Sequence, residues 1–217
     1  MKALIFDMDG VLVNSTEYVT KAFNELLRKY GVALTAEYRK KCIGMSLRDQ
    51  IKMWKKDFNI REEIDPINFS EKSFEIEQKL MEKELTPNKH LISLIDAAKK
   101  QKVRIAVATS STKSRAEKIL NLVGVFDKLD GFVTAEDVKL HKPHPQIFLK
   151  AAERLGVNQE ECVVFEDALN GIQSAKKAGM KAVAILTTYT KKDDFKNTAD
   201  LIINDFSEIS LKQLENI

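Results

Sequence analysis

Residues 3–13 read ALIFDMDGVLV, and this stretch decides how the rest of the chain is interpreted. A short, continuously apolar run is typical of a strand buried on both faces of a parallel sheet. The run leads directly into Asp7 and Asp9, and then into Gly10, which tolerates backbone conformations that other residues resist. We therefore expect both carboxylates at the end of a central strand, where ligands bind in open α/β sheets.

The closeness of Asp7 and Asp9 has a consequence of its own. Two neighbouring carboxylates repel each other, and both stay ionised only with a cation nearby. Mg²⁺, which prefers oxygen ligands, is the natural candidate. Asp-Gly pairs also mark ordinary turns, however, so the interpretation depends on what the rest of the chain supplies.

The composition limits the class of protein. The chain has 217 residues, enough for one full domain and a small second one, and its 44% apolar and 31% charged residues are typical of a globular protein. Its net charge of +3 comes from dispersed residues, which favours a mixed solvated surface over nucleic-acid binding. No apolar run approaches the roughly 20 residues that span a bilayer. We expect a monomer or weak dimer without a membrane partner.

The cysteines and histidines suggest neither a disulfide framework nor a metal site. Cys42 and Cys162 are the only cysteines, and nothing suggests that they are paired. His141 and His144 lie three residues apart, but no cysteine or third histidine supports them, so surface positions are favoured. The N-terminus reads as a strand rather than as a signal peptide, and we expect a cytoplasmic protein.

The pattern of apolar residues divides the chain. Residues 15–86 show helical spacing and no strand pattern, whereas strands expected at 104–108, 132–134, 162–165, 182–186 and 201–203 alternate with helices. Such alternation implies a parallel sheet with right-handed crossovers. The prediction is an α/β protein, in which residues 1–14 and 87–217 form a doubly wound parallel sheet and residues 15–86 form an inserted helical cap domain. The two crossings between the parts make a hinge plausible.

Three further stretches carry candidate functional groups. Thr109 and Ser110 end the second strand before a helix, where they could hold phosphoryl oxygens or simply cap the helix. Lys142 lies within KLHKPHP, whose prolines restrict the backbone. Glu166 and Asp167 end another strand, and consecutive carboxylates there would be destabilising without a counter-charge.

The order of these motifs resembles the haloacid dehalogenase superfamily, and the resemblance covers essentially the whole chain. It implies that Asp7 is the nucleophile and Asp9 the general acid/base of phosphoryl transfer. It further implies that Thr109 binds the transferring phosphoryl group and that Lys142 stabilises its charge. The physical requirements agree, because phosphoryl transfer needs mainly in-line positioning and charge neutralisation.

The same resemblance implies a Mg²⁺ site. Its ligands would be the Asp7 carboxylate, the Asp9 main-chain carbonyl and Asp167. Glu166 would belong to the same metal site by contacting these ligands rather than the ion. Mg²⁺ and Lys142 would together offset the repulsion between the anionic nucleophile and an anionic substrate.

The position of the insert resembles the helical-cap subgroup, which includes sugar-phosphate phosphatases and beta-phosphoglucomutase. Within it, Gly44, Ser46 and Arg48 look like the substrate-binding loop, although Ser46 reads equally well as a helix N-cap. Arg48 could bind a second phosphate or a sugar acid through two hydrogen bonds. Asn14 and Asn88 depart from the subgroup's usual Asp and Gly, and both lie at the expected hinge.

A Mg²⁺-dependent phosphatase of a small phosphorylated metabolite is the favoured function, with a phosphosugar mutase as the alternative. Val19 stands where the mutase has a cap-side histidine, and Arg48 comes one residue later than the mutase's arginine, which favours hydrolysis. A dehalogenase would leave Asp9 without a role. A phosphonate hydrolase would need a cap lysine that forms an imine. Lys55 or Lys56 could serve, but nothing in the sequence distinguishes either of them from other lysines. A non-catalytic binding protein on the same fold is disfavoured by the full set of charged groups.

Overall fold

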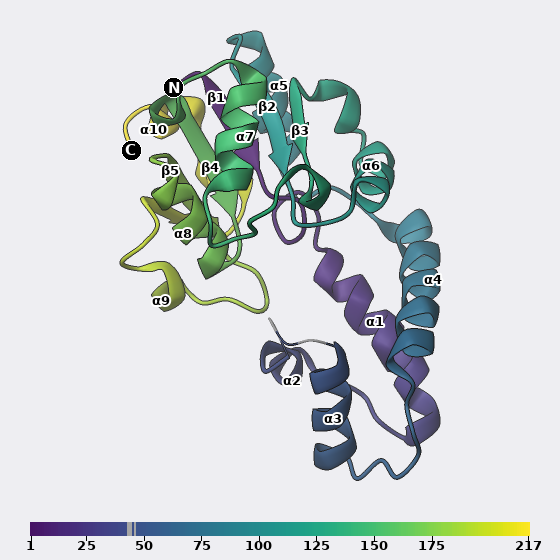
Figure 1. Cartoon of the computed structure of the whole chain (residues 1–217). Coiled ribbons are helices and arrows are strands. Elements are labelled where there is room, and N and C mark those ends of the chain that lie inside the picture. The colour runs from purple at the N-terminus through teal and green to yellow at the C-terminus, as the bar shows by residue number, and fades with distance from the viewer. Residues whose placement is uncertain (43–44, 46) are drawn as a thin grey trace. The chain divides into compact units, whose positions relative to one another are not determined.

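The computed structural model describes residues 1–42, 45 and 47–217. The chain divides into two compact units, one formed by Met1–Asn14 with Leu85–Ile217 and the other by Ser15–Glu84 (Figure 1). We refer to them as the core unit and the cap unit. The chain leaves the core unit after Asn14 and returns to it at Leu85.

The core unit contains a six-stranded parallel sheet. Its strands are β1 (Ala3–Phe6), β2 (Arg104–Ala108), β3 (Gly131–Val133), β4 (Cys162–Glu166), β5 (Lys181–Ile185) and β6 (Leu201–Ile203). They lie in the order β3-β2-β1-β4-β5-β6, and every neighbouring pair is parallel. Phe6 of β1 pairs with Val107 on one side and Phe165 on the other. The predicted central position of β1 is confirmed, and the strand order changes direction beside it, where such sheets bind ligands.

Helices cover both faces of this sheet (Figure 1). They are α5 (Leu91–Lys100), α6 (Lys113–Leu122), α7 (Gln146–Leu155), α8 (Leu169–Lys177), α9 (Lys192–Phe195) and α10 (Leu211–Leu214). Ile5 packs in one cluster with Phe148 of α7 and Ile172 of α8. Because side chains alternate along a strand, Phe6 points the other way, where it stacks on Phe165 at 4.9 Å between ring centroids. The doubly wound α/β prediction is therefore confirmed.

The cap unit consists of α1 (Ser15–Leu27), α2 (Ala36–Lys40), α3 (Leu47–Asp57) and α4 (Pro66–Glu84), with no strand among its described residues. Its core is aromatic: Trp54 is fully buried and lies 5.4 Å from Phe23 and 5.6 Å from Phe69 between ring centroids. The Tyr18 hydroxyl donates to the Glu84 carbonyl at 3.0 Å and so ties the start of the unit to its end. Within the described part of the chain, no helix is both long enough and apolar enough to cross a membrane.

Candidate active site

The two predicted aspartates follow β1 directly. The Asp7 amide donates to the Phe165 carbonyl at 2.9 Å, which extends the pairing of β1 with β4 by one residue. Gly10 then turns the chain with a φ of +86°, a conformation in which side chains other than glycine are strained. A Cβ at Gly10 would also overlap the Asp167 carboxylate. Glycine is therefore required here both for its backbone conformation and for the lack of a side chain. The same close approach brings Asp167 against the loop that carries Asp9.

Lys142 lies between two carboxylates. Its Nζ is 2.5 Å from Asp7 Oδ1 and 2.6 Å from Glu166 Oε1, and it lies 3.4 Å from the Ala108 carbonyl oxygen. The Lys142 side chain is only 6% exposed, and Nζ lies 4.9 Å from the centre of the Phe148 ring. We call Asp7, Lys142 and Glu166 the lysine cluster. These distances show that the ends of β1 and β4 and the segment before α7 meet at one point.

The segment that carries Lys142 is held by its own hydrogen bonds. The amides of Lys139 and Leu140 both donate to Gln146 Oε1, at 2.9 and 2.8 Å, and the Ser174 hydroxyl donates to the His144 carbonyl at 2.8 Å. The Lys142–Pro143 peptide bond is cis. Side chains from α7 and α8 thus fix the backbone on either side of Lys142.

Glu166 uses both of its oxygens within the core unit. Oε1 accepts from Lys142, while Oε2 accepts from the amides of Asp167 and Ala168, at 2.9 Å each. Gly171 of α8 lies so close that a Cβ there would overlap the Glu166 carboxylate. Glu166 therefore orients Lys142 and the backbone of Asp167 at the same time.

The electrostatics of this region show an excess of negative charge. Burial is the main cause that raises the pKa of Asp7 to about 7; the carboxylates of Glu166 and Asp9 contribute to the rise, and Lys142 opposes it. Burial also raises the pKa of Asp167 well above its ordinary value, with Glu166 and Asp7 adding to the effect. The two carboxylates of the lysine cluster hold the pKa of Lys142 above its ordinary value although burial lowers it. One lysine thus faces several carboxylates.

This excess of negative charge fits a divalent cation. A cation next to Asp7 and Asp167 would favour their ionised forms. Among the residues that the structure describes, no three histidine, cysteine, aspartate or glutamate side chains converge as a ready-made metal site. Mg²⁺ commonly takes one or two carboxylates and keeps several waters. His141 and His144 are exposed, as expected.

Asp9 lies in a second group of charged residues that the sequence did not reveal. Its Oδ2 accepts from the Ser111 hydroxyl at 2.9 Å and from Arg115 Nη1 at 2.8 Å, and Arg115 Nη1 is also 2.7 Å from Ser111 Oγ. We call Asp9, Ser111 and Arg115 the arginine cluster. Ser111 lies two residues before α6 and Arg115 lies in the first turn of that helix, so the only available signal was their closeness along the chain.

Thr109 and Ser110 occupy different environments at the end of β2. Thr109 is buried, its amide donates to the Val133 carbonyl at 3.0 Å, and its hydroxyl oxygen accepts from the Ser111 amide at 3.1 Å. A hydroxyl that accepts one bond still has a proton to donate, so Thr109 can also bind a phosphoryl oxygen. Ser110 is exposed, and its predicted role in substrate binding stays a prediction.

The predicted cap residues are only partly described. Gly44 and Ser46 lie outside the described residues. Arg48 is exposed and is the second residue of α3. The substrate-binding roles expected for these three residues stay predictions.

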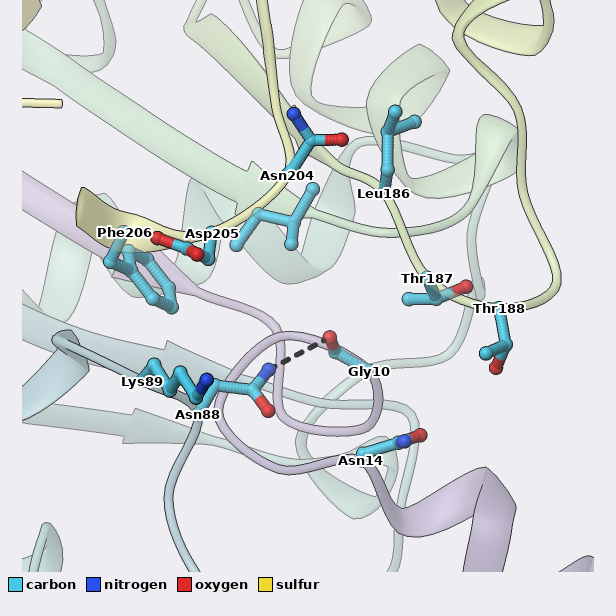
Figure 2. Close-up of a pocket in the computed structure, with 11 residues that line it drawn as sticks. Gly10, Asn14, Asn88, Lys89, Leu186, Thr187, Thr188, Asn204, Asp205 and Phe206 are labelled. Carbon is cyan, nitrogen blue, oxygen red and sulfur yellow. Dashed lines mark hydrogen bonds between the residues drawn. The ribbon is translucent and has the colours of Figure 1, made fainter. Parts of the chain in front are cut away.

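Asn88 makes three hydrogen bonds to the loop after Asp9. Its amide donates to the Leu12 carbonyl at 2.8 Å, while its side-chain Nδ2 donates to the carbonyls of Gly10 at 3.2 Å and Val11 at 2.7 Å. Figure 2 shows the bond from Asn88 to Gly10. Both residues line a pocket of about 270 Å³, as does Asn14. The departure from glycine at position 88 thus adds side-chain bonds that glycine lacks.

Comparison with known proteins identifies the family. Residues 4–185 match the family model described as haloacid dehalogenase-like hydrolase. The fructose-1-phosphate phosphatase YqaB of Escherichia coli is 34% identical over 188 residues, covering 84% of this chain and 95% of that protein.

Two solved structures cover nearly the whole chain. CbbY from Rhodobacter sphaeroides in complex with phosphate has a TM-score of 0.80 at 25% identity and covers 99% of both chains. Beta-phosphoglucomutase from Clostridium difficile has a TM-score of 0.78 at 25% identity, covering 100% of this chain and 96% of that one. The chain therefore belongs to the haloacid dehalogenase-like hydrolases, in the group that carries a helical cap after the first strand.

Proposed function

We propose that the protein is a Mg²⁺-dependent phosphatase that hydrolyses a small phosphorylated metabolite, expected to be a sugar phosphate, through an aspartyl phosphate on Asp7. The observation that carries the proposal is the lysine cluster, in which a buried ammonium lies 2.5 Å from the Asp7 carboxylate at the end of the central strand. The proposed nucleophile is thereby held in place, and a positive charge stands ready for the phosphoryl oxygens.

In the first half of the reaction, an oxygen of Asp7 attacks phosphorus. The new bond joins that oxygen to phosphorus, and the bond from phosphorus to the substrate oxygen breaks. A protonated Asp9 gives its proton to the departing oxygen, so that the leaving group departs as an alcohol. Thr109 and Lys142 bind the oxygens of the phosphoryl group as it moves.

In the second half, water releases the phosphate. Asp9, now a carboxylate, accepts a proton from the water while the water oxygen attacks phosphorus. The bond between phosphorus and the Asp7 oxygen then breaks. Inorganic phosphate is formed, Asp7 is regenerated as a carboxylate and Asp9 is protonated again. The net reaction consumes one ester and one water and yields one alcohol and one phosphate.

The proposed Mg²⁺ ligands are the Asp7 carboxylate, the Asp9 main-chain carbonyl and Asp167. When bound, the ion would offset the charge that builds up on the phosphoryl oxygens. Glu166 was also expected at this metal site. Because both of its oxygens accept from N–H donors, we assign it to orienting Lys142 and Asp167 rather than to direct ligation.

The relatives suggest the substrate class but differ in reaction. One acts on fructose 1-phosphate by its name, and another is a mutase. A phosphosugar mutase therefore remains the second candidate. The valine at position 19 supports hydrolysis, because it can neither donate nor accept a proton where the mutase carries a histidine.

The deciding experiment measures phosphate release from a panel of sugar phosphates, with Mg²⁺ and with chelator. Release that needs Mg²⁺ supports the proposal, and full activity in chelator contradicts the metal assignment. A ³¹P NMR time course with beta-glucose 1-phosphate and a trace of the bisphosphate separates the two reactions. Glucose 6-phosphate forming faster than inorganic phosphate would establish the mutase instead.

A further inference from the structure

We propose that Arg115 is a positioning residue for the general acid/base: it holds Oδ2 of Asp9 and so fixes the orientation of the Asp9 carboxylate. This inference rests on the proposed function, because it needs Asp9 to be the acid/base. It concerns a residue on α6 that none of the four family motifs contains.

The geometry of the arginine cluster is a closed triangle. Arg115 Nη1 contacts both Asp9 Oδ2 and Ser111 Oγ, and Ser111 Oγ contacts the same carboxylate oxygen, with all three distances between 2.7 and 2.9 Å. Two donors therefore converge on a single oxygen. The Arg115 side chain is 17% exposed, so its guanidinium is largely withdrawn from solvent.

The two partners of Asp9 come from a rigid part of the core unit. Ala116 and Ile119 of α6 are fully buried, which fixes the rotation of the helix that carries Arg115. Asp9 itself lies in the loop after β1, where it forms an isolated β-bridge with Val13, and its side chain is 32% exposed. A short side chain in such a place has several rotamers available, and anchoring one oxygen selects among them.

Arginine suits a positioning role and not a proton-transfer role. Its guanidinium has no acceptor and stays protonated at any working pH, so it can neither take nor give the reaction's proton. Its planar fork presents donors at fixed angles, which orients a carboxylate better than a flexible ammonium does. Lys142, the other buried cation of the core unit, is already shared by Asp7 and Glu166.

The competing explanation is that Arg115 and Asp9 form a purely structural ion pair, although partly exposed pairs contribute little to stability on average. The two explanations differ in which chemical step they affect. If Arg115 orients Asp9, its loss slows the steps that need a proton from or to Asp9. If it only braces α6, its loss disturbs every substrate alike.

The test uses two substrates of similar shape, p-nitrophenyl phosphate and benzyl phosphate. Nitrophenolate leaves without a proton, whereas the benzyl alcohol oxygen needs one. For Arg115→Met we expect kcat/KM for benzyl phosphate to fall about a hundredfold, while kcat/KM for p-nitrophenyl phosphate changes less than about threefold. Turnover of p-nitrophenyl phosphate should still slow about tenfold and show a burst of nitrophenol, because the water step needs Asp9.

Two further variants keep the test independent of folding. Arg115→Lys retains a cation and should recover part of the benzyl phosphate activity. Lys113→Met removes the same charge from an exposed position of the same helix and should leave both substrates unaffected. Melting temperatures of all variants are measured beside the kinetics.

Equal losses on both substrates, or no loss on either, would overturn the assignment of Arg115. A wild-type enzyme that hydrolyses neither substrate in the presence of Mg²⁺ would overturn the proposed function instead, and this inference with it. The two failures are therefore distinguishable.

Discussion

The lysine cluster and the arginine cluster each pair a cation with one of the two aspartates, but they differ in burial. The Lys142 and Glu166 side chains are nearly inaccessible, whereas the Asp9 side chain is about one-third exposed. A buried ion pair is strongly destabilised when one partner is lost, while a partly exposed pair is screened by water. We infer that the lysine cluster determines the charge around the nucleophile Asp7, whereas the arginine cluster determines only the orientation of the Asp9 carboxylate.

The largest effect is expected from the nucleophile of the lysine cluster. Asp7→Asn should abolish turnover, by more than about 10⁴-fold, because an amide cannot attack phosphorus. The fold should survive, since one of several crowded carboxylates is removed. Phosphate release and circular dichroism measure the two effects. Substantial remaining activity would take the nucleophile role away from Asp7.

The next prediction compares the two cations directly. Lys142→Met leaves Asp7 and Glu166 buried without their counter-charge, so the free energy of unfolding should fall by about 3–5 kcal/mol. Arg115→Met should cost about 1 kcal/mol or less. Urea unfolding of both variants measures the difference. Similar costs for the two substitutions would contradict the distinction between the clusters.

Asp167 lies beside the lysine cluster and should act through the metal. Asp167→Ala removes one proposed oxygen ligand, so the Mg²⁺ concentration for half-maximal activity should rise at least about tenfold. Titration of activity with Mg²⁺ measures this. Ca²⁺ should inhibit the wild type, because its larger and looser coordination shell disturbs in-line geometry. An unchanged Mg²⁺ requirement in the variant would exclude Asp167 as a ligand.

The raised pKa of Asp7 gives a prediction on pH. Folding raises this pKa from its ordinary value of 3.8 to about 7, so the folded state binds the proton more tightly. Stability without metal should therefore decline as pH rises through that interval. Because Mg²⁺ binds the ionised carboxylate, it should raise the melting temperature more at about pH 8 than at about pH 5. Equal shifts at both pH values would contradict this coupling, and Asp7→Asn serves as the control.

The two clusters also differ in how well the sequence predicted them. Asp7 and Glu166 each follow or end a continuously apolar strand, and parallel strands end at one edge, so their meeting could be predicted. The contact between Arg115 and Asp9 depends on the rotation of α6, which a sequence pattern does not fix. The sequence pattern does not locate the short helices α2, α9 and α10, because four or five residues contain too little periodicity to detect.

The smallest effect on activity is expected at Asn88, which belongs to neither cluster but holds the loop after Asp9. Asn88→Gly removes two side-chain hydrogen bonds, to the carbonyls of Gly10 and Val11, while the backbone bond to Leu12 remains. We expect a loss of about 1–2 kcal/mol in the free energy of unfolding.

If the loop positions Asp9, Asn88→Gly should lower the activity on benzyl phosphate more than the activity on p-nitrophenyl phosphate. The effect should have the same direction as for Arg115→Met but should be weaker. Asn88→Asp, which keeps the size but places a carboxylate against two carbonyls, should be less active than Asn88→Gly. A larger loss of activity on p-nitrophenyl phosphate would instead indicate that the loop positions Asp7. That result would contradict the distinction between the two clusters.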